Sequence, residues 1–214
     1  GIGILAQSEN SQTQALGSFI GGLTLTAAAA LSADSFDLTW ADTDLAFYSG
    51  ITGTVLGGSI ALMSGADFQG PGLIGGSTGL LAGLIYDHLN PMSLRDSSLG
   101  ASGTLAGLIL GAGTAFFMPN DPDVEVAGAL IGAGALVGYS SMLWAAPKLQ
   151  FGNGDYLGIF GSMAIGGFVG GSLPGLIYGA EEQGAQTLGG AMLGTALGYG
   201  TGLTISQFTD MSSA

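Results

Sequence analysis

Seven long apolar stretches with almost no charge dominate this chain of 214 residues. As α-helices of about 17 to 23 residues, they would each be roughly 26 to 35 Å long, which matches the hydrocarbon core of a bilayer. Of the 17 ionised residues only Asp87 and Glu125 fall inside a stretch, each within two residues of its end. The composition therefore predicts transmembrane helices over approximately 15–32, 46–64, 72–88, 99–117, 124–144, 156–178 and 184–205.

Glycine is concentrated inside these stretches, which hold 35 of the 42 glycines. In water-exposed helices each glycine is less favourable than alanine by roughly 1 kcal/mol, so that the total cost would be on the order of 35 kcal/mol against a domain stability of about 5–15 kcal/mol. In a bilayer the helix persists because unpaired backbone groups are costlier still, and small residues let helices pack closely. We therefore expect the glycines to form helix-packing faces.

Glycines spaced by three or four residues share one helical face, as in "GITGTVLGG" at 50–58. This pattern resembles the glycine-zipper helices of several membrane assemblies, including channel-forming and translocase-type proteins. The resemblance covers the Gly-x-x-x-Gly spacing alone and implies no site and no activity. The predicted helix-packing residues are Gly50, Gly53, Gly57, Gly75, Gly79, Gly83, Gly103, Gly107, Gly134, Gly138, Gly190, Gly194 and Gly198.

The stretches alternate between two types with a period of about 55 residues. One type carries "FIGG" at 19–22, "LIGG" at 73–76, "LIGA" at 130–133 and "TLGG" at 187–190; the other begins with a Gly-x-x-Gly pair. Two helices per repeat describe αα-hairpins that bury their faces by stacking on neighbours. We predict an all-α, membrane-embedded bundle of about seven glycine-zipper helices arranged as repeated αα-hairpins.

We treat residues 1–214 as a single helical repeat domain. Projecting the repeat back by one period makes residues 1–14 the end of a truncated preceding repeat, so we expect the C-terminal part of a longer chain. At the borders, aromatic residues cluster as in interfacial belts. Trp40 is expected in a loop, and Pro174 is expected to kink the sixth helix or end it early.

The net charge of −13, with only Arg95 and Lys148 basic, argues against a nucleic-acid partner, because phosphate contacts need clustered basic residues. The absence of cysteine excludes disulfides and thiolate metal sites. Loops on both predicted sides of the membrane are acidic, so the positive-inside rule gives thin evidence of orientation. We expect an integral membrane protein of the bacterial cell envelope and leave open in which membrane it lies.

Several motifs contain residues of types that occur in catalytic or metal sites. "GGSTG" at 75–79 fits the Gly-x-Ser-x-Gly pattern around Ser77, but no strand is predicted before it. The only histidine, His88, has no cluster of further metal ligands. Acidic residues could bind Ca²⁺, although capping and solvation are favoured for them; these weak candidates are Asp34, Asp37, Asp42 and Asp44. We predict no catalytic residue, no cofactor and no enzymatic activity.

The function expected from this pattern is that of a structural or assembly domain. Its glycine-lined helix faces would pack against copies of itself or against other membrane subunits, with membrane lipid around them. Two alternatives stay open. One is a pore or transport module enclosed by the hairpins, and the other is a soluble, self-associating glycine-rich helical bundle.

Overall fold

The computed structural model describes residues 39–67, 69–118, 122–151, 155–178 and 184–208. Within these residues the chain forms six α-helices and one 3₁₀ turn, which confirms the all-α prediction. They are α3 (Trp40–Ser64), α4 (Gln69–Leu89), α5 (Leu94–Phe117), α6 (Val124–Ala145), η1 (Ala146–Lys148), α7 (Asp155–Tyr178) and α8 (Gly184–Phe208). The predicted helix over 15–32 and the segment 1–14 lie outside the described residues.

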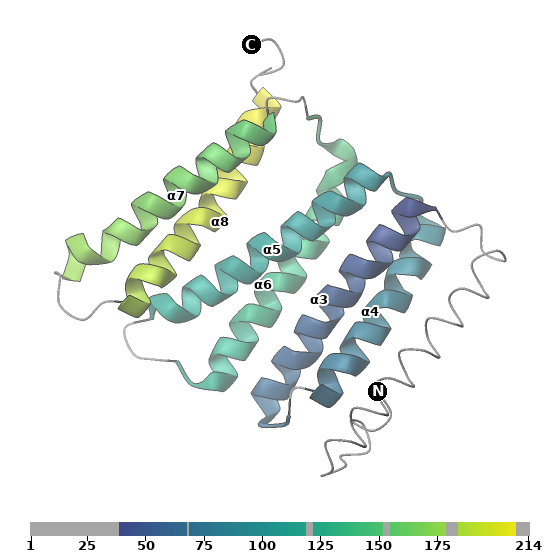
Figure 1. The fold of residues 1–214 in the computed structure, drawn as a ribbon, viewed down its shortest axis with the longest axis horizontal. Coiled ribbons are helices and arrows are strands. Elements are labelled where there is room, and N and C mark those ends of the chain that lie inside the picture. The colour runs from purple at the N-terminus through teal and green to yellow at the C-terminus, as the bar shows by residue number, and fades with distance from the viewer. Residues whose placement is uncertain (1–38, 68, 119–121, 152–154, 179–183, 209–214) are drawn as a thin grey trace.

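Consecutive helices pair as the hairpins α3/α4, α5/α6 and α7/α8, which confirms the predicted αα-hairpins (Figure 1). The hairpins stand beside one another with α5 in the middle, packed against α8 on one side and against α3 on the other. Helix α3 also contacts α6. Helices α4 and α7 are the outer members of the row, and among the described helices the backbone of each packs only against that of its own hairpin partner.

Two helices begin earlier than the apolar stretches because polar residues cap them. The Thr39 side chain and the Asp42 side chain form a capping box, and α3 therefore starts at Trp40, so the prediction that Trp40 lies in a loop is wrong. The Ser93 hydroxyl accepts a hydrogen bond from the Asp96 N–H and starts α5 at Leu94. Acidic residues in a first turn also complement the helix dipole.

Helix α7 continues through Pro174 to Tyr178, so the expectation that this helix ends early is wrong. Pro174 is fully buried, and a Cβ atom added to Gly190 of α8 would lie 3.3 Å from its ring. The proline packs against a glycine of the neighbouring helix at this point. Close packing of this kind holds a helix together where proline removes a backbone hydrogen bond.

Among the described residues, four helices are long and apolar enough to cross a membrane: α3, α5, α6 with η1, and α7. Helices α4 and α8 correspond to the predicted membrane spans 72–88 and 184–205. They are not among the helices that are apolar enough to cross a membrane, so the prediction of spans is not met there. Helix α4 carries Pro71, Asp87 and His88, and α8 carries four threonines, and in both helices many glycines replace larger apolar side chains.

Candidate functional site

The two helices of each hairpin approach until backbone lies against backbone. In α3/α4, a Cβ atom added to Gly53 would overlap the carbonyl group of Gly75, at 2.9 Å from its carbon. One added to Gly57 would lie 2.7 Å from the carbonyl carbon of Pro71. Gly75 faces the Gly53 carbonyl in return. A side chain larger than hydrogen at these positions would force the helices apart.

The other two hairpins repeat this arrangement. In α5/α6, a Cβ atom on Gly107 would lie 2.7 Å from the carbonyl carbon of Gly134, and in α7/α8 one on Gly194 would lie 2.7 Å from that of Gly166. The carbonyl oxygens lie closer still. The predicted glycines whose added Cβ would overlap a backbone carbonyl of the partner helix are Gly53, Gly57, Gly75, Gly79, Gly103, Gly107, Gly134, Gly138, Gly190, Gly194 and Gly198.

Two predicted glycines differ from the rest. A Cβ atom on Gly50 would make an ordinary contact, 3.4 Å from the Gly76 carbonyl oxygen. One on Gly83 would meet the side chain of Ser49, 2.8 Å from its Cβ, and the backbone of Ala46. The tightest approach of α3 and α4 therefore lies over Gly53 and Gly57, away from these two positions.

The structure also brings glycines to these interfaces that the sequence analysis did not select. Gly166 and Gly170 of α7 face Gly194 and Gly190, and Gly111 of α5 faces α6. Their four-residue spacing is the signal that could have found them. Between hairpins, a Cβ atom on Gly189 of α8 would lie 2.5 Å from the backbone nitrogen of Phe117 in α5.

Hydroxyl groups connect one hairpin to the next. Thr52 of α3 and Thr104 of α5 share a buried hydrogen bond of 3.0 Å. Ser49 of α3 is hydrogen-bonded to Tyr139 of α6, and Ser102 of α5 to Tyr199 of α8. These hydroxyls are therefore satisfied by one another inside the protein.

The weak Ca²⁺ candidates have other partners where they are described. The Asp42 carboxylate accepts a hydrogen bond from the backbone N–H of Thr39, and its carboxyl group also shares a hydrogen bond with Asp87 of α4. The Asp44 carboxylate accepts hydrogen bonds from Ser97 at 2.7 Å and from Ser98. In the described ranges no three acidic or histidine side chains gather as a metal site. Asp34 and Asp37 lie outside these ranges.

The motif around Ser77 lies inside α4, so the strand-to-helix turn of a nucleophile elbow is not formed there. Ser77 is exposed on this helix. His88 lies in the last turn of α4, where it is exposed too, and the adjacent Asp87 is buried. The side chains of Ser77 and His88 therefore both lie at the surface of the described part.

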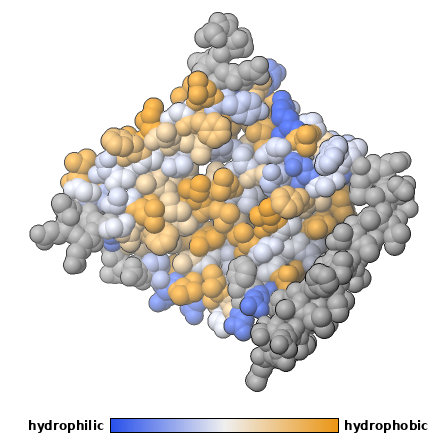
Figure 2. All heavy atoms as spheres, viewed as in Figure 1, coloured by the Kyte–Doolittle hydropathy of each residue, from blue (hydrophilic) through white to orange (hydrophobic). Residues whose placement is uncertain are grey.

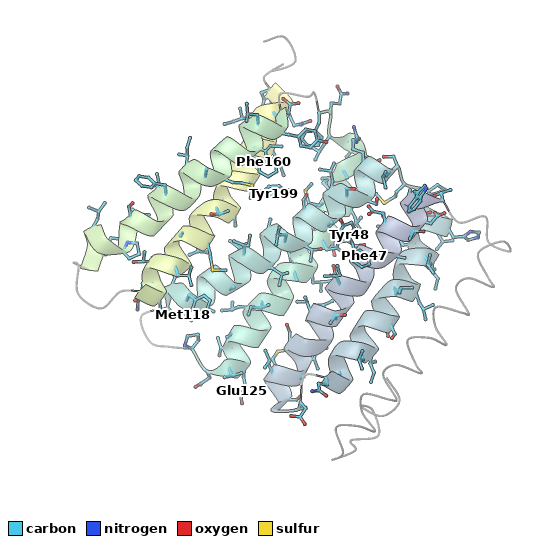
Figure 3. All side chains as sticks on the ribbon, viewed as in Figure 1. Phe47, Tyr48, Met118, Glu125, Phe160 and Tyr199 are labelled. Atoms are coloured by element: carbon cyan, nitrogen blue, oxygen red, sulfur yellow. The ribbon has the colours of Figure 1, made fainter. Side chains whose placement is uncertain are left out.

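A groove of about 560 Å³ lies between α5, α7 and α8, and we call it the α5/α7/α8 groove. Apolar side chains such as Leu105, Ile109 and Met163 dominate its lining. Phe160 of α7 and Tyr199 of α8 also line the groove. Figure 3 shows both residues at the place where the α7/α8 hairpin stands apart from α5. Arg95 lines the groove at the start of α5.

Comparison of the chain with protein families, with characterised proteins and with solved structures gives no match. A function for the chain therefore has to be argued from its own residues. The glycine interfaces and the α5/α7/α8 groove are the features of the described part from which a function is proposed below.

The sequence analysis did not select the residues of the groove. Arg95 drew attention only as one of two basic residues, and Ser102 and Tyr199 lie 97 positions apart. Two helices of different hairpins bring them together. In the sequence, Arg95 is marked only as a polar residue at the border of an apolar stretch. Many residues of this chain have the same kind of position, so this feature does not single it out.

Proposed function

We propose that this chain is a membrane-embedded structural domain that assembles with copies of itself or with other membrane subunits. Its three hairpins are preformed units, each closed by contact between glycine backbones. Helices α3, α5, α6 and α7 cross the bilayer, and α4 and α8 are held against them. The bacterial cell envelope is the setting proposed for it.

The observation that carries this proposal is the apolar surface of α7. Only 11% of the most apolar part of Asp155–Ile177 is buried inside the protein. Phe168 and Leu176 are 79% and 81% exposed, and large apolar side chains of the other helices are exposed as well. Figure 2 shows hydrophobic residues spread over one face of the molecule, with hydrophilic residues gathered toward the helix ends. Lipid or another apolar protein surface would cover such a face favourably.

The glycine contacts determine which surfaces of the protein remain free for assembly. Eleven of the thirteen predicted helix-packing glycines lie within hairpins of one chain, where partner backbones already occupy the space beside them. Assembly would therefore use the outer faces of the row, above all that of α7. Replacing Gly53, Gly79 or Gly194 by leucine would open a hairpin first and reduce assembly as a consequence.

Fractionation of the native protein tests the membrane part of the proposal. We expect the protein to stay with membranes through a carbonate wash and to be released by detergent. An apolar helix surface resists removal by high pH, whereas a protein held only by charge is washed off. Release into the aqueous phase by carbonate alone would favour the soluble bundle instead.

Sizing of the detergent extract tests the assembly part. We expect a complex larger than one chain, and the double variant Phe168→Ala, Leu176→Ala to be extracted equally well but to run as a smaller species. The matched control is Leu136→Ala, Val137→Ala on the exposed side of α6. A wild-type protein of one chain per micelle would show that α7 faces lipid alone.

A further inference from the structure

The α5/α7/α8 groove has the shape of a site for a chain-like ligand. Its lining on α5 runs from Leu94 to Ile109, a helix length of about 22 Å at ~1.5 Å per residue. This length is more than half of the ~30 Å hydrocarbon thickness of a bilayer. The volume of about 560 Å³ lies in the range of ligand sites, which is about 300–1,000 Å³.

One end of the groove has a charged residue, Arg95, which forms an ion pair with Asp96. The Arg95 guanidinium donates through Nε and Nη2 to the Asp96 carboxylate, at 3.1 and 2.8 Å. Nη2 also donates to the carbonyl oxygen of Ala146 at 3.3 Å. Within the described residues these bonds leave the two N–H groups of Nη1 without a partner, and the side chain is 43% exposed. A planar guanidinium held in this way presents donors suited to phosphate oxygens.

The Arg95 end of the groove lies where the helices end. Leu94 and Arg95 begin α5, Tyr156 is in the first turn of α7, and Leu203 is in the last part of α8. These termini lie on the same side of the bundle, at the top in Figure 1. In a bilayer this is the level of the lipid phosphates, whereas Ile109 lies at the depth of the acyl chains. The polarity along the groove thus follows the polarity of a phospholipid.

We infer that the α5/α7/α8 groove binds one phospholipid, with an acyl chain along α5 and the phosphate at Arg95. This inference rests on the proposed membrane setting. The hydroxyls of Ser102 and Tyr199 are paired with each other inside the groove, so the acyl chain meets no unsatisfied polar group there. The bound lipid fills the space that separates α7 from α5.

The test uses the full chain reconstituted into vesicles of phosphatidylcholine. Flotation of the vesicles first reports whether the protein enters the bilayer. The protein is then extracted in a mild detergent, washed free of loosely held lipid and analysed by native mass spectrometry. We expect one retained phosphatidylcholine per chain. Ala106→Trp, which fills the groove, should reduce this occupancy about tenfold, and Ala133→Trp, on an exposed position of α6, should not.

A second pair of variants tests the polar end. Arg95→Gln should lower phosphatidylcholine retention severalfold, while Lys148→Gln should leave it unchanged, because Lys148 lies over the ring of Trp144 and not in the groove. Helical content and elution volume show whether each variant is folded. Because Arg95→Gln adds no bulk to the packed helices, it keeps the test decisive if Ala106→Trp does not fold.

The outcomes separate this inference from the proposed function. If the protein floats with the vesicles but the wild type retains no phospholipid, the groove is not a lipid site and the membrane setting stands. Equal retention by the wild type, Ala106→Trp and Arg95→Gln would overturn the inference in the same way. Failure of the wild type to float would overturn both proposals together.

Discussion

At the scale of single residues, glycine has opposite effects at different places in these helices. Where two backbones touch, as at Gly107 and Gly134, the missing side chain makes the contact. Where a glycine such as Gly200 faces open space, the missing side chain only lowers the helix propensity. The same substitution should therefore change stability in opposite directions at the two kinds of position.

Gly107→Ala and Gly200→Ala test this difference. We expect Gly107→Ala to lower the free energy of unfolding by roughly 1–3 kcal/mol, because its methyl group would overlap the Gly134 carbonyl. Gly200→Ala should raise it by up to about 1 kcal/mol through helix propensity. Denaturant unfolding in one detergent, followed by circular dichroism, measures both. Changes of the same sign would contradict the close contact of α5 and α6.

The spacing of glycines could be read from the sequence, but their partners could not. A spacing of four residues places Gly103 and Gly107 on one face of a helix whatever that face meets. That they meet Gly138 and Gly134 depends on the offset between two helices, which the chain does not encode locally. For the same reason the sequence analysis could not tell Gly50, which has space beside it, from Gly53.

At the scale of helices, two kinds of contact hold the fold together. Helices of one hairpin touch through their backbones, whereas helices of different hairpins are also linked by hydroxyl pairs. In the pair of Thr52 and Thr104, the Thr52 hydroxyl is 2.9 Å from the carbonyl oxygen of Tyr48 and donates to it. The Thr104 hydroxyl lies 3.0 Å from Thr52 and 3.4 Å from the carbonyl oxygen of Gly100, so the bond to Thr52 is the shorter of its two.

A double-mutant cycle with Thr52→Val and Thr104→Val should measure this link. We expect a coupling free energy of about 0.6 kcal/mol, and below ~1.7 kcal/mol, as for hydrogen bonds between membrane helices. The control cycle pairs Thr104→Val with Thr204→Val, since Thr204 bonds to the Gly200 carbonyl of its own helix at 2.8 Å. Coupling as large in the control cycle would mean that the hydroxyl pair contributes nothing specific.

Most helix positions could be predicted because charge is absent from the helix interiors. The errors lie where polar residues belong to a helix. Trp40 was assigned to a loop, although the capping box of Thr39 and Asp42 starts α3 at this residue. Pro174 was expected to kink α7 or end it early, but α8 packs against it and the helix does not end there. Local propensity predicts the ends of such helices poorly when caps and neighbouring helices decide them.

At the scale of the molecule, the hairpin is the natural unit of folding and of unfolding. Among the described helices the backbone of α7 packs only against that of α8, and α8 reaches the rest of the protein through α5. Separating α7 from α8 would break an interface of touching backbones. Detaching both from α5 would break a less extensive one.

Mechanical extraction from a bilayer tests this order. Pulling the chain from its C-terminus with an atomic force microscope should remove α7 and α8 in one step, and later steps should also release helices in pairs. Gly194→Leu should divide the first step into two, because it opens the α7/α8 interface. Release of the wild-type helices one at a time would show that the hairpins are not cooperative units.

The glycine interfaces also bear on how the helices recognise one another. Carbonyl groups and Cα atoms are common to every residue, so the three interfaces present nearly the same surface and contain little information about which helix belongs with which. The connections supply that information, since only four, six and five residues separate the helices of the three hairpins. A chain cut or greatly lengthened in these connections would exchange helices between hairpins, and between molecules, at little cost in contact energy. The short connections therefore protect this protein from entanglement with its own copies.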